Sequence, residues 1–315
     1  MFNLGEKAID IAKSRKVTFG DIRIIAARTQ SLTVKNGEVG ALDDIQMLGF
    51  GVRILHQGAW GFASSHEVGA SEIERVTALA ISIAEASACL KKEEVRLAPE
   101  PVYRDKWQTP FLIDPFTISL EEKLKILYQV DAILRKSKKV KSATSSMSFS
   151  REHLFHATTE GSRIEQILLT SGAGYSADAV DGNEVQTRSY PAAGGQTMSM
   201  GYELIDTLRL VENAERTREE AVALLTAPEC PSAKLDLIIG GNQLALQIHE
   251  SVGHATELDR VLGYEESFAG SSFVTLEKYG KFKYGSPIVN LVADGTVPGG
   301  LATVGYDDDG VRAQR

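Results

Sequence analysis

The chain has 315 residues, of which 43% are hydrophobic and 24% charged, and its formal net charge is −8. These values are typical of a globular protein large enough for two domains, and they argue against direct nucleic-acid binding, which needs clustered Lys and Arg. The chain contains only two cysteines, which indicates a reducing compartment and predicts a cytoplasmic location. No stretch of about 18 apolar residues occurs, so the sequence predicts no membrane span.

The first part of the chain alternates between helical and β-type patterns. Residues 3–14 place apolar side chains at helical spacing, which predicts an amphipathic helix. Residues 21–65 contain short β-type runs separated by turn signals such as Asn36-Gly37, which predicts an antiparallel meander. Helical spacing returns over residues 71–91 and predicts a second helix.

The same alternation continues to about residue 228. A capping box formed by Ser119 and Glu122 marks the start of a third helix, and residues 142–205 return to β-type patterning with glycine-rich breaks. A second capping box predicts that another helix starts at Thr217. We therefore expect residues 1–228 to form an N-terminal α+β domain, in which helices pack on an antiparallel sheet.

The remaining residues have a different pattern. The segment "LDLIIGG", residues 235–241, reads as a short apolar strand that leads into a helix bearing two histidines. Beyond that helix, residues 285–315 are β-type with loose glycine turns and end in a polar loop. We expect residues 229–315 to be the beginning of a β-rich C-terminal domain whose remainder is missing.

The stretch "GGNQLALQIHESVGHATELDR", residues 240–260, contains His249, Glu250 and His254. Histidine is the commonest metal ligand, and a carboxylate beside it can act as the base in hydrolysis. In a regular α-helix, residues five apart point roughly 140° away from each other, so one zinc ion could not bind both imidazoles. A π-type turn, or a helix end at Gly253, would bring them together, and we then expect Gly253→Ala to weaken metal binding.

Spacing alone leaves a second interpretation open for this motif. His249 would be a partly buried histidine, Glu250 a surface carboxylate, and His254 a cation near the helix C-terminus. Glu257 and Asp259 follow closely; they are candidates to coordinate a metal or to hydrogen-bond a coordinating histidine, or they lie in a solvated helix end.

Other potential ligands are weaker candidates. His153 and His156 fit a solvated strand better than a metal site, and the run Asp307-Asp308-Asp309 lacks the alternating ligand positions of a calcium loop, so we interpret it as a solvated loop. Cys230 is best explained as a small buried residue.

The histidine segment, its continuation "GSPIVNLVADGTVPGGLATVGYDDDGVRAQR", and the N-terminal segments "SLTVKNGEV" and "GFGVRILHQGAWGFASS" resemble the TldD/PmbA family, once named modulators of DNA gyrase. The resemblance is stronger to the TldD branch. It implies a cytoplasmic zinc-dependent peptidase with His249 and His254 as metal ligands and Glu250 as the general base. The family's third ligand is a downstream cysteine, and this chain has no cysteine after Cys230.

The resemblance also implies substrates and partners. We expect an unfolded or extended peptide as substrate, and either a homodimer or a heterodimer with a TldE/PmbA-type subunit. Because the chain looks C-terminally truncated relative to the family, we expect weak zinc binding and little activity from these 315 residues alone. The alternative function is a non-catalytic peptide-binding or scaffolding subunit of a TldD/TldE-like complex.

Overall fold

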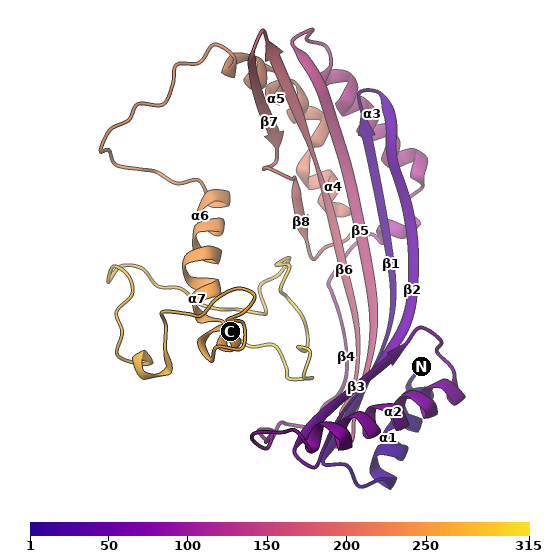
Figure 1. Cartoon of the computed structure of the whole chain (residues 1–315). Coiled ribbons are helices and arrows are strands. Elements are labelled where there is room, and N and C mark those ends of the chain that lie inside the picture. Colours follow the sequence, from indigo (N-terminus) through magenta and orange to yellow (C-terminus); the bar gives the residue numbers. More distant parts are fainter. The chain divides into compact units, whose positions relative to one another are not determined.

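The computed structural model describes residues 1–315, which divide into two compact units (Figure 1). Unit 1 comprises Met1–Ala227 and Ala293–Arg315, and unit 2 comprises Pro228–Val292. The chain therefore leaves unit 1 and later returns to it. The fold is α+β, with an antiparallel sheet and packed helices, as the patterning predicts. The division into domains after residue 228 stays a prediction.

Unit 1 is built on an eight-stranded sheet, in which six strands follow the order β3-β2-β1-β5-β6-β4 and β7 and β8 also pair with β6. The strands are β1 (Phe19–Lys35), β2 (Glu38–His56), β3 (Ala59–Ser65), β4 (Arg104–Gln108), β5 (Val140–Thr158), β6 (Arg163–Asp181), β7 (Glu184–Tyr190) and β8 (Gln196–Met198). All pairs are antiparallel except β4 with β6. Asn36 and Gly37 have φ of 51° and 84°, the left-handed conformation that a two-residue hairpin turn requires, so the predicted meander is confirmed.

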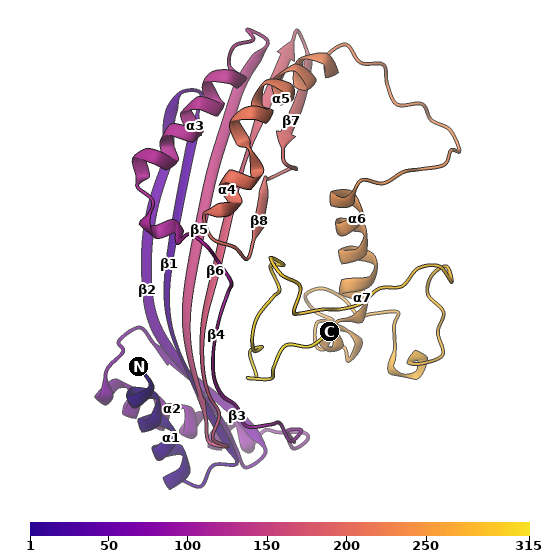
Figure 2. The same cartoon turned by 180° about the vertical axis from the view of Figure 1, so that it is seen from behind.

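Helices cover one face of this sheet (Figures 1 and 2). They are α1 (Phe2–Ser14), α2 (Ala70–Ala88), α3 (Leu120–Leu134), α4 (Glu203–Leu208) and α5 (Leu210–Leu224), with a 3₁₀ turn at Pro115–Thr117. Unit 2 contains α6 (Gly241–Ile248), a π-helical turn (His249–Gly253), α7 (His254–Thr256), α8 (Leu258–Val261) and a 3₁₀ turn at Leu276–Lys278. None of these helices combines the length and apolar character needed to cross a bilayer.

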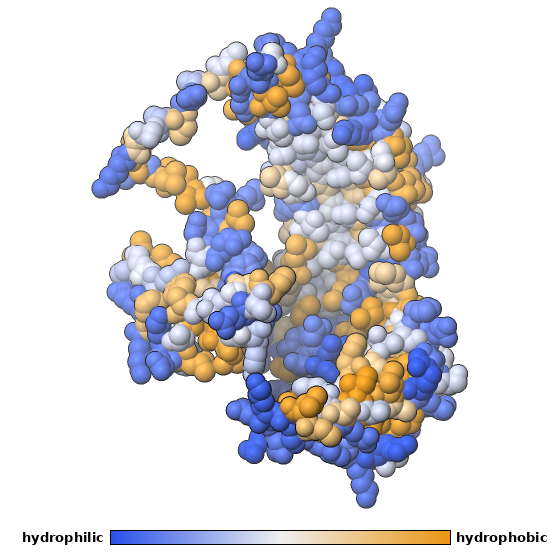
Figure 3. Space-filling model, in the orientation of Figure 1, coloured by the Kyte–Doolittle hydropathy of each residue, from blue (hydrophilic) through white to orange (hydrophobic).

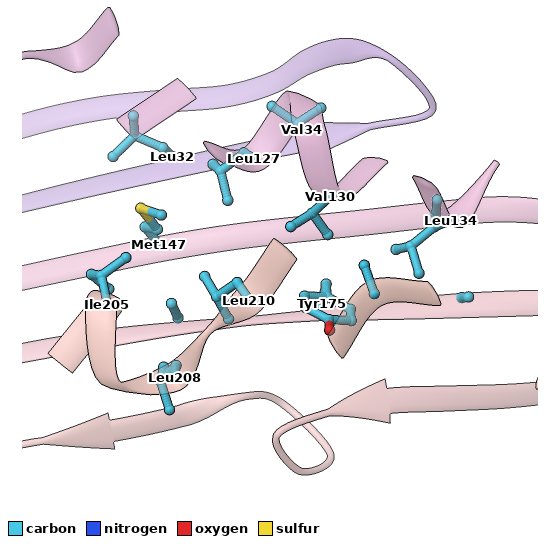
Figure 4. Packing of buried hydrophobic residues seen from close by; sticks show 14 of the residues in the cluster. Leu32, Val34, Leu127, Val130, Leu134, Met147, Tyr175, Ile205, Leu208 and Leu210 are labelled. Carbon is cyan, nitrogen blue, oxygen red and sulfur yellow. The ribbon is translucent and has the colours of Figure 1, made fainter. Parts of the chain in front are cut away.

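Two separate hydrophobic cores lie between the sheet and its helices. One packs α1 and α2 on the strands around Ile22 and Ile54, and the other packs α3, α4 and α5 on the strands around Leu32 and Met147. In the second core, Leu127 of α3 lies close to Leu32 and Met147 (Figure 4). The predicted capping box at the start of α3 is present, since the side chain of Ser119 accepts from the Glu122 amide and the Glu122 carboxylate accepts from Ser119.

The start of α5 differs from the prediction. The helix begins at Leu210, and Thr217 lies inside it, fully buried rather than at an N-cap. Its hydroxyl donates to the Asn213 carbonyl at 3.1 Å, which satisfies the polar group within the helix. Leu210, Ala214, Thr217 and Ala221 form the buried stripe of the helix, so hydrophobic packing overrides the capping signal.

The β-type patterns after residue 228 do not form strands. The structure has only an isolated bridge between Tyr306 and Arg312 in this region, although strands were expected at 235–241 and within 285–315. A strand needs a hydrogen-bonding neighbour, and apart from that bridge no segment pairs with these runs. Apolar side chains there stay exposed (Figure 3), as Ile238 at 98% illustrates.

Residues 304–312 are held on the sheet of unit 1 by hydrogen bonds and an ion pair. The buried side chain of Gln166 accepts from the amides of Gly305 and Tyr306 at 3.0 and 2.9 Å and donates to the Tyr306 carbonyl at 2.9 Å. Asp307 accepts from two amides of its own turn, and Asp309 forms an ion pair with Arg53 at 2.9 Å. The three aspartates are exposed, but they form a structured turn rather than a solvated loop.

His153 and His156 lie on opposite faces of β5, and neither belongs to a metal cluster. His156 is 2% exposed and bonds Asp21 at 3.1 Å, which corrects the expectation of a solvated residue. Burial raises the pKa of Asp21, but hydrogen bonds from His156 and Arg53 outweigh it, so the pKa lies below its usual value. His153 pairs with Glu165 at 2.9 Å.

Replacing Gln166 by Ala tests whether its hydrogen bonds hold residues 304–312 on the sheet. The change leaves two amides and one carbonyl without partners, each worth about 1–3 kcal/mol when buried. We expect hydrogen-exchange protection of the Gly305 and Tyr306 amides to fall at least tenfold. Gln186→Ala is the control, because Gln186 is half-buried and its side chain bonds only the Glu184 carboxylate. Unchanged protection in Gln166→Ala would contradict the role of this side chain.

Lys123 should make the free energy of unfolding depend on pH. It is fully buried, donates to Gln30 and to the Pro115 carbonyl, and lies over the Phe149 ring at 4.6 Å. Desolvation lowers its pKa from 10.5 to about 8. Between these values the unfolded chain holds a proton that the folded chain has lost, so raising the pH favours folding.

We therefore expect the free energy of unfolding to rise by roughly 1–2 kcal/mol between pH 8 and pH 10, relative to Lys123→Met. The measurement is denaturant unfolding of both proteins at each pH. Parallel pH profiles for the two proteins would show that Lys123 is not the group responsible.

Candidate metal centre

The two histidines of the motif lie on one side of a locally widened helix. After α6, residues His249–Gly253 form a π-helical turn, and the His254 amide donates to the His249 carbonyl five residues back. A π turn restores alignment at a five-residue offset. The His249 and His254 rings accordingly lie with their centroids 4.4 Å apart, at an interplanar angle of 72°.

Side-chain hydroxyls satisfy carbonyl groups along the widened turn. The Tyr284 hydroxyl donates to the Ser251 carbonyl at 2.7 Å. The Thr256 hydroxyl lies 2.9 and 3.1 Å from the carbonyls of Val252 and Gly253. These contacts compensate for regular helical bonding that the turn disrupts. Tyr284 lies 30 residues beyond His254, and no motif or spacing pointed to it.

Gly253 is at the end of the π turn but is not required by its backbone. Its φ of −52° and ψ of −64° are right-handed helical values open to any residue. An added Cβ would meet nothing closer than the Ile248 carbonyl oxygen at 3.9 Å. The structure therefore removes the steric reason for expecting Gly253→Ala to weaken metal binding.

His249, Glu250 and His254 each offer one ligand atom, and these atoms all lie within 4.8 Å of one another. The Glu250 carboxylate lies 3.9 Å from His249 Nε2 and 3.8 Å from His254 Nε2. Two nitrogens on one zinc, each at about 2.0–2.1 Å, are roughly 3.3 Å apart in tetrahedral geometry. Small side-chain rotations would reach this spacing, so the donor set fits a zinc ion.

The other expected candidates play different parts. Glu257 Oε1 bonds His254 Nδ1 at 2.8 Å, and this bond, together with Arg260, holds the pKa of Glu257 below its usual value although burial opposes the shift. The Asp259 carboxylate accepts only from the Arg260 amide at 2.8 Å and does not join the cluster. Cys230 is exposed, contrary to the expectation of a buried residue, and also lies outside the cluster.

Comparison with known families identifies the class of protein. Three models match successive parts of the chain: PmbA/TldA metallopeptidase domain 1 at residues 20–84, the central domain at 113–225, and the C-terminal domain at 232–315. The chain belongs to the PmbA/TldD metallopeptidase family. Family membership supports a metal ion as the cofactor.

Particular relatives carry the same indication. Metalloprotease MJ0996 of Methanocaldococcus jannaschii is 28% identical over 94% of this chain and 62% of its own length. A metalloprotease TldD homolog of Buchnera aphidicola is 24% identical over 96% of this chain and 60% of its own. The chain thus spans about three fifths of the length of these relatives.

Solved structures share the fold. TldE from Thermococcus kodakarensis superposes with a TM-score of 0.65 at 15% identity, covering 98% of this chain and 66% of that one. A Thermotoga maritima protein named as a modulator of a DNA gyrase gives 0.59 at 19% identity, covering 73% of this chain and 50% of that one.

Gly253→Ala tests whether the π turn needs a glycine. We expect zinc affinity to stay within about threefold, and the free energy of unfolding to rise by up to about 1 kcal/mol, because alanine has less backbone entropy to lose. Zinc titration and thermal unfolding of both proteins measure these values. A loss of affinity well beyond threefold would show that the glycine serves a purpose other than backbone geometry.

Proposed function

We propose that the protein acts as a zinc-dependent metallopeptidase of the TldD type on extended peptides. The observation that carries the proposal is the π turn, which brings His249, His254 and the Glu250 carboxylate within 4.8 Å of one another. Family membership supports the same activity. An acidic protein with net charge −8 has no evident surface for direct nucleic-acid binding.

In this proposal each residue of the cluster has a defined role. His249 and His254 hold the zinc ion through Nε2, the atoms that lie nearest Glu250. Bound zinc would polarise the scissile carbonyl and acidify a water molecule. The Glu250 carboxylate accepts a proton from the attacking water and returns it to the leaving amine. At 3.8 and 3.9 Å from the two nitrogens, the Glu250 carboxylate is too distant for a direct hydrogen bond to either imidazole, so neither ring engages it.

The cluster is open to solvent. The segment "GYEESFAGSSF", residues 263–273, has a β-type pattern that favours strand addition by an extended peptide, but in the structure these residues form turns and irregular chain. His249 and Glu250 are each 60% exposed, so the cluster lies on an open helix surface in unit 2. Carbonyls of folded proteins are mostly hydrogen-bonded, so such a cluster acts on segments whose backbone is free.

The donor set requires a further ligand. Catalytic zinc sites usually have three protein ligands and a water, and the cluster provides two imidazoles once Glu250 serves as the base. We propose that a cysteine thiolate completes the site, as the family resemblance implies, and that the 315-residue chain binds zinc more weakly than a protein with that ligand. A TldE-type partner or a second copy, and a cytoplasmic location, belong to the same proposal.

The alternative is a non-catalytic peptide-binding subunit. The high exposure of His249 and Glu250, and the position of Cys230 outside the cluster, favour it. A scaffolding subunit would bind peptides without needing stoichiometric zinc.

Glu250→Gln separates the two functions. We expect this variant to bind zinc within about threefold of the wild type, and whatever peptide cleavage the wild type shows to fall at least roughly 100-fold, because a general base contributes about 10²–10⁴. Glu266→Gln is the matched control, since Glu266 is exposed and lies outside the cluster. Zinc content by elemental analysis and cleavage of an unstructured peptide, with and without an added TldE-type subunit, are the readouts.

His249→Ala should lose zinc and cleavage together. A wild-type protein that binds peptide without zinc would favour the scaffolding function. Full activity of Glu250→Gln would remove Glu250 from the mechanism.

A further inference from the structure

His254 is the first member of a short hydrogen-bonded chain that the peptidase proposal does not use. Its Nδ1 lies 2.8 Å from Glu257 Oε1, and Glu257 Oε2 lies 3.0 Å from Arg260 Nη2. The three residues are spaced three apart along α7 and α8. Glu257 is the single residue between these helices, and its ψ of 119° interrupts the helical path between them.

We infer that Glu257 and Arg260 are positioning residues, which fix the tautomer and the orientation of His254 so that Nε2 is free to bind the metal. This inference rests on the proposed function. A carboxylate can only accept a hydrogen bond, so a 2.8 Å contact with Glu257 requires the proton of a neutral His254 ring to be on Nδ1. The Nε2 lone pair then faces the side of the cluster where Glu250 lies, at 3.8 Å.

Arg260 holds the Glu257 carboxylate beside His254. It is 18% exposed, and its Nη1 is within 3.4 Å of the Ala269 carbonyl, which ties the ion pair to the loop after α8. Arg260 Nη2 is also 3.5 Å from His254 Nδ1, too far to compete with the 2.8 Å contact.

His249 has no comparable support. Its nearest carboxylate is Glu250 at 3.9 Å, and its side chain is 60% exposed against 32% for His254. The structure therefore has one oriented imidazole and one adaptable imidazole. Partners that hold a metal-binding histidine in this way typically contribute 10- to 100-fold to metal affinity.

The tautomer of His254 is measurable without metal. The 15N and ring-proton spectrum of 15N-histidine-labelled protein, at a pH where imidazole is neutral, distinguishes a protonated Nδ1 from a protonated Nε2, and His254→Gln assigns the signals among the six histidines. We expect Nδ1 of His254 to be protonated in the wild type. Glu257→Ala should shift it to the Nε2-protonated form that free histidine prefers, whereas Glu257→Gln, which keeps an acceptor oxygen, should retain part of the original population.

Zinc titration completes the test on the same 315-residue proteins. Glu257→Ala should bind zinc 10- to 100-fold more weakly than the wild type, and Arg260→Gln should show a smaller loss. Asp259→Asn is the control, because the Asp259 side chain bonds only a backbone amide of its own turn, and the change should alter neither the tautomer nor the affinity.

The outcomes distinguish this inference from the proposed function. A wild-type His254 protonated on Nε2, or a Glu257→Ala variant with unchanged tautomer and unchanged zinc affinity, overturns the inference even if the wild type binds zinc. If the wild type binds no zinc in any form, while Glu257→Ala abolishes the Nδ1-protonated state, the metallopeptidase proposal fails and the orientation of His254 by Glu257 stands.

Discussion

The long antiparallel ladder of β1, β2, β5 and β6 is the constraint on which unit 1 depends. These strands have 17 to 19 residues and pair continuously apart from two register shifts. Side chains of a strand alternate between the two faces of the sheet. The register of a strand therefore decides which of its side chains face the helices at both ends of the sheet. In β1, Ile22 enters the core under α1 and α2, and Leu32, ten residues on, enters the core under α3. A slip by one residue would expose both cores at once.

The space between the two cores is polar, which explains why they remain separate. Arg28 pairs with Asp44 at 2.7 Å on the helix-covered face, and buried Lys123 reaches Gln30 beside it. The Phe116 ring lies under the guanidinium of Arg28 at 4.7 Å and packs beside this belt. Hydrogen bonds and an ion pair offset the desolvation of these polar groups, which a continuous apolar core would leave without partners. The same ladder therefore supports two helix-covered apolar cores and a polar strip between them.

Local signals predicted the parts of this fold that local chemistry determines. The Asn36-Gly37 turn fixes its own backbone, and Ser119 and Glu122 form their capping box within one turn of helix, so both were readable from the sequence. The start of α5, the burial of His156 and the parallel pairing of β4 depend on partners far along the chain, which spacing does not reveal. The strands expected after residue 228 failed for the same reason, because a β pattern without a neighbour forms no ladder.

The candidate site shows the same division between local and distant information. His249, Glu250 and His254 were readable as a group, whereas Tyr284 and Arg260, which support the turn and the histidine, were not.

The π turn has a consequence that a four-residue spacing on a regular helix would not share. Glu250 and His254 are four residues apart, while Glu250 and His249 are neighbours, and the widened turn places the carboxylate almost equally far from both imidazoles, at 3.8 and 3.9 Å. In the proposed mechanism, the base then lies beside both nitrogens that would bind the ion. The additional residue in the turn thus sets the position of Glu250 relative to the two imidazoles as well as the alignment of the imidazoles with each other.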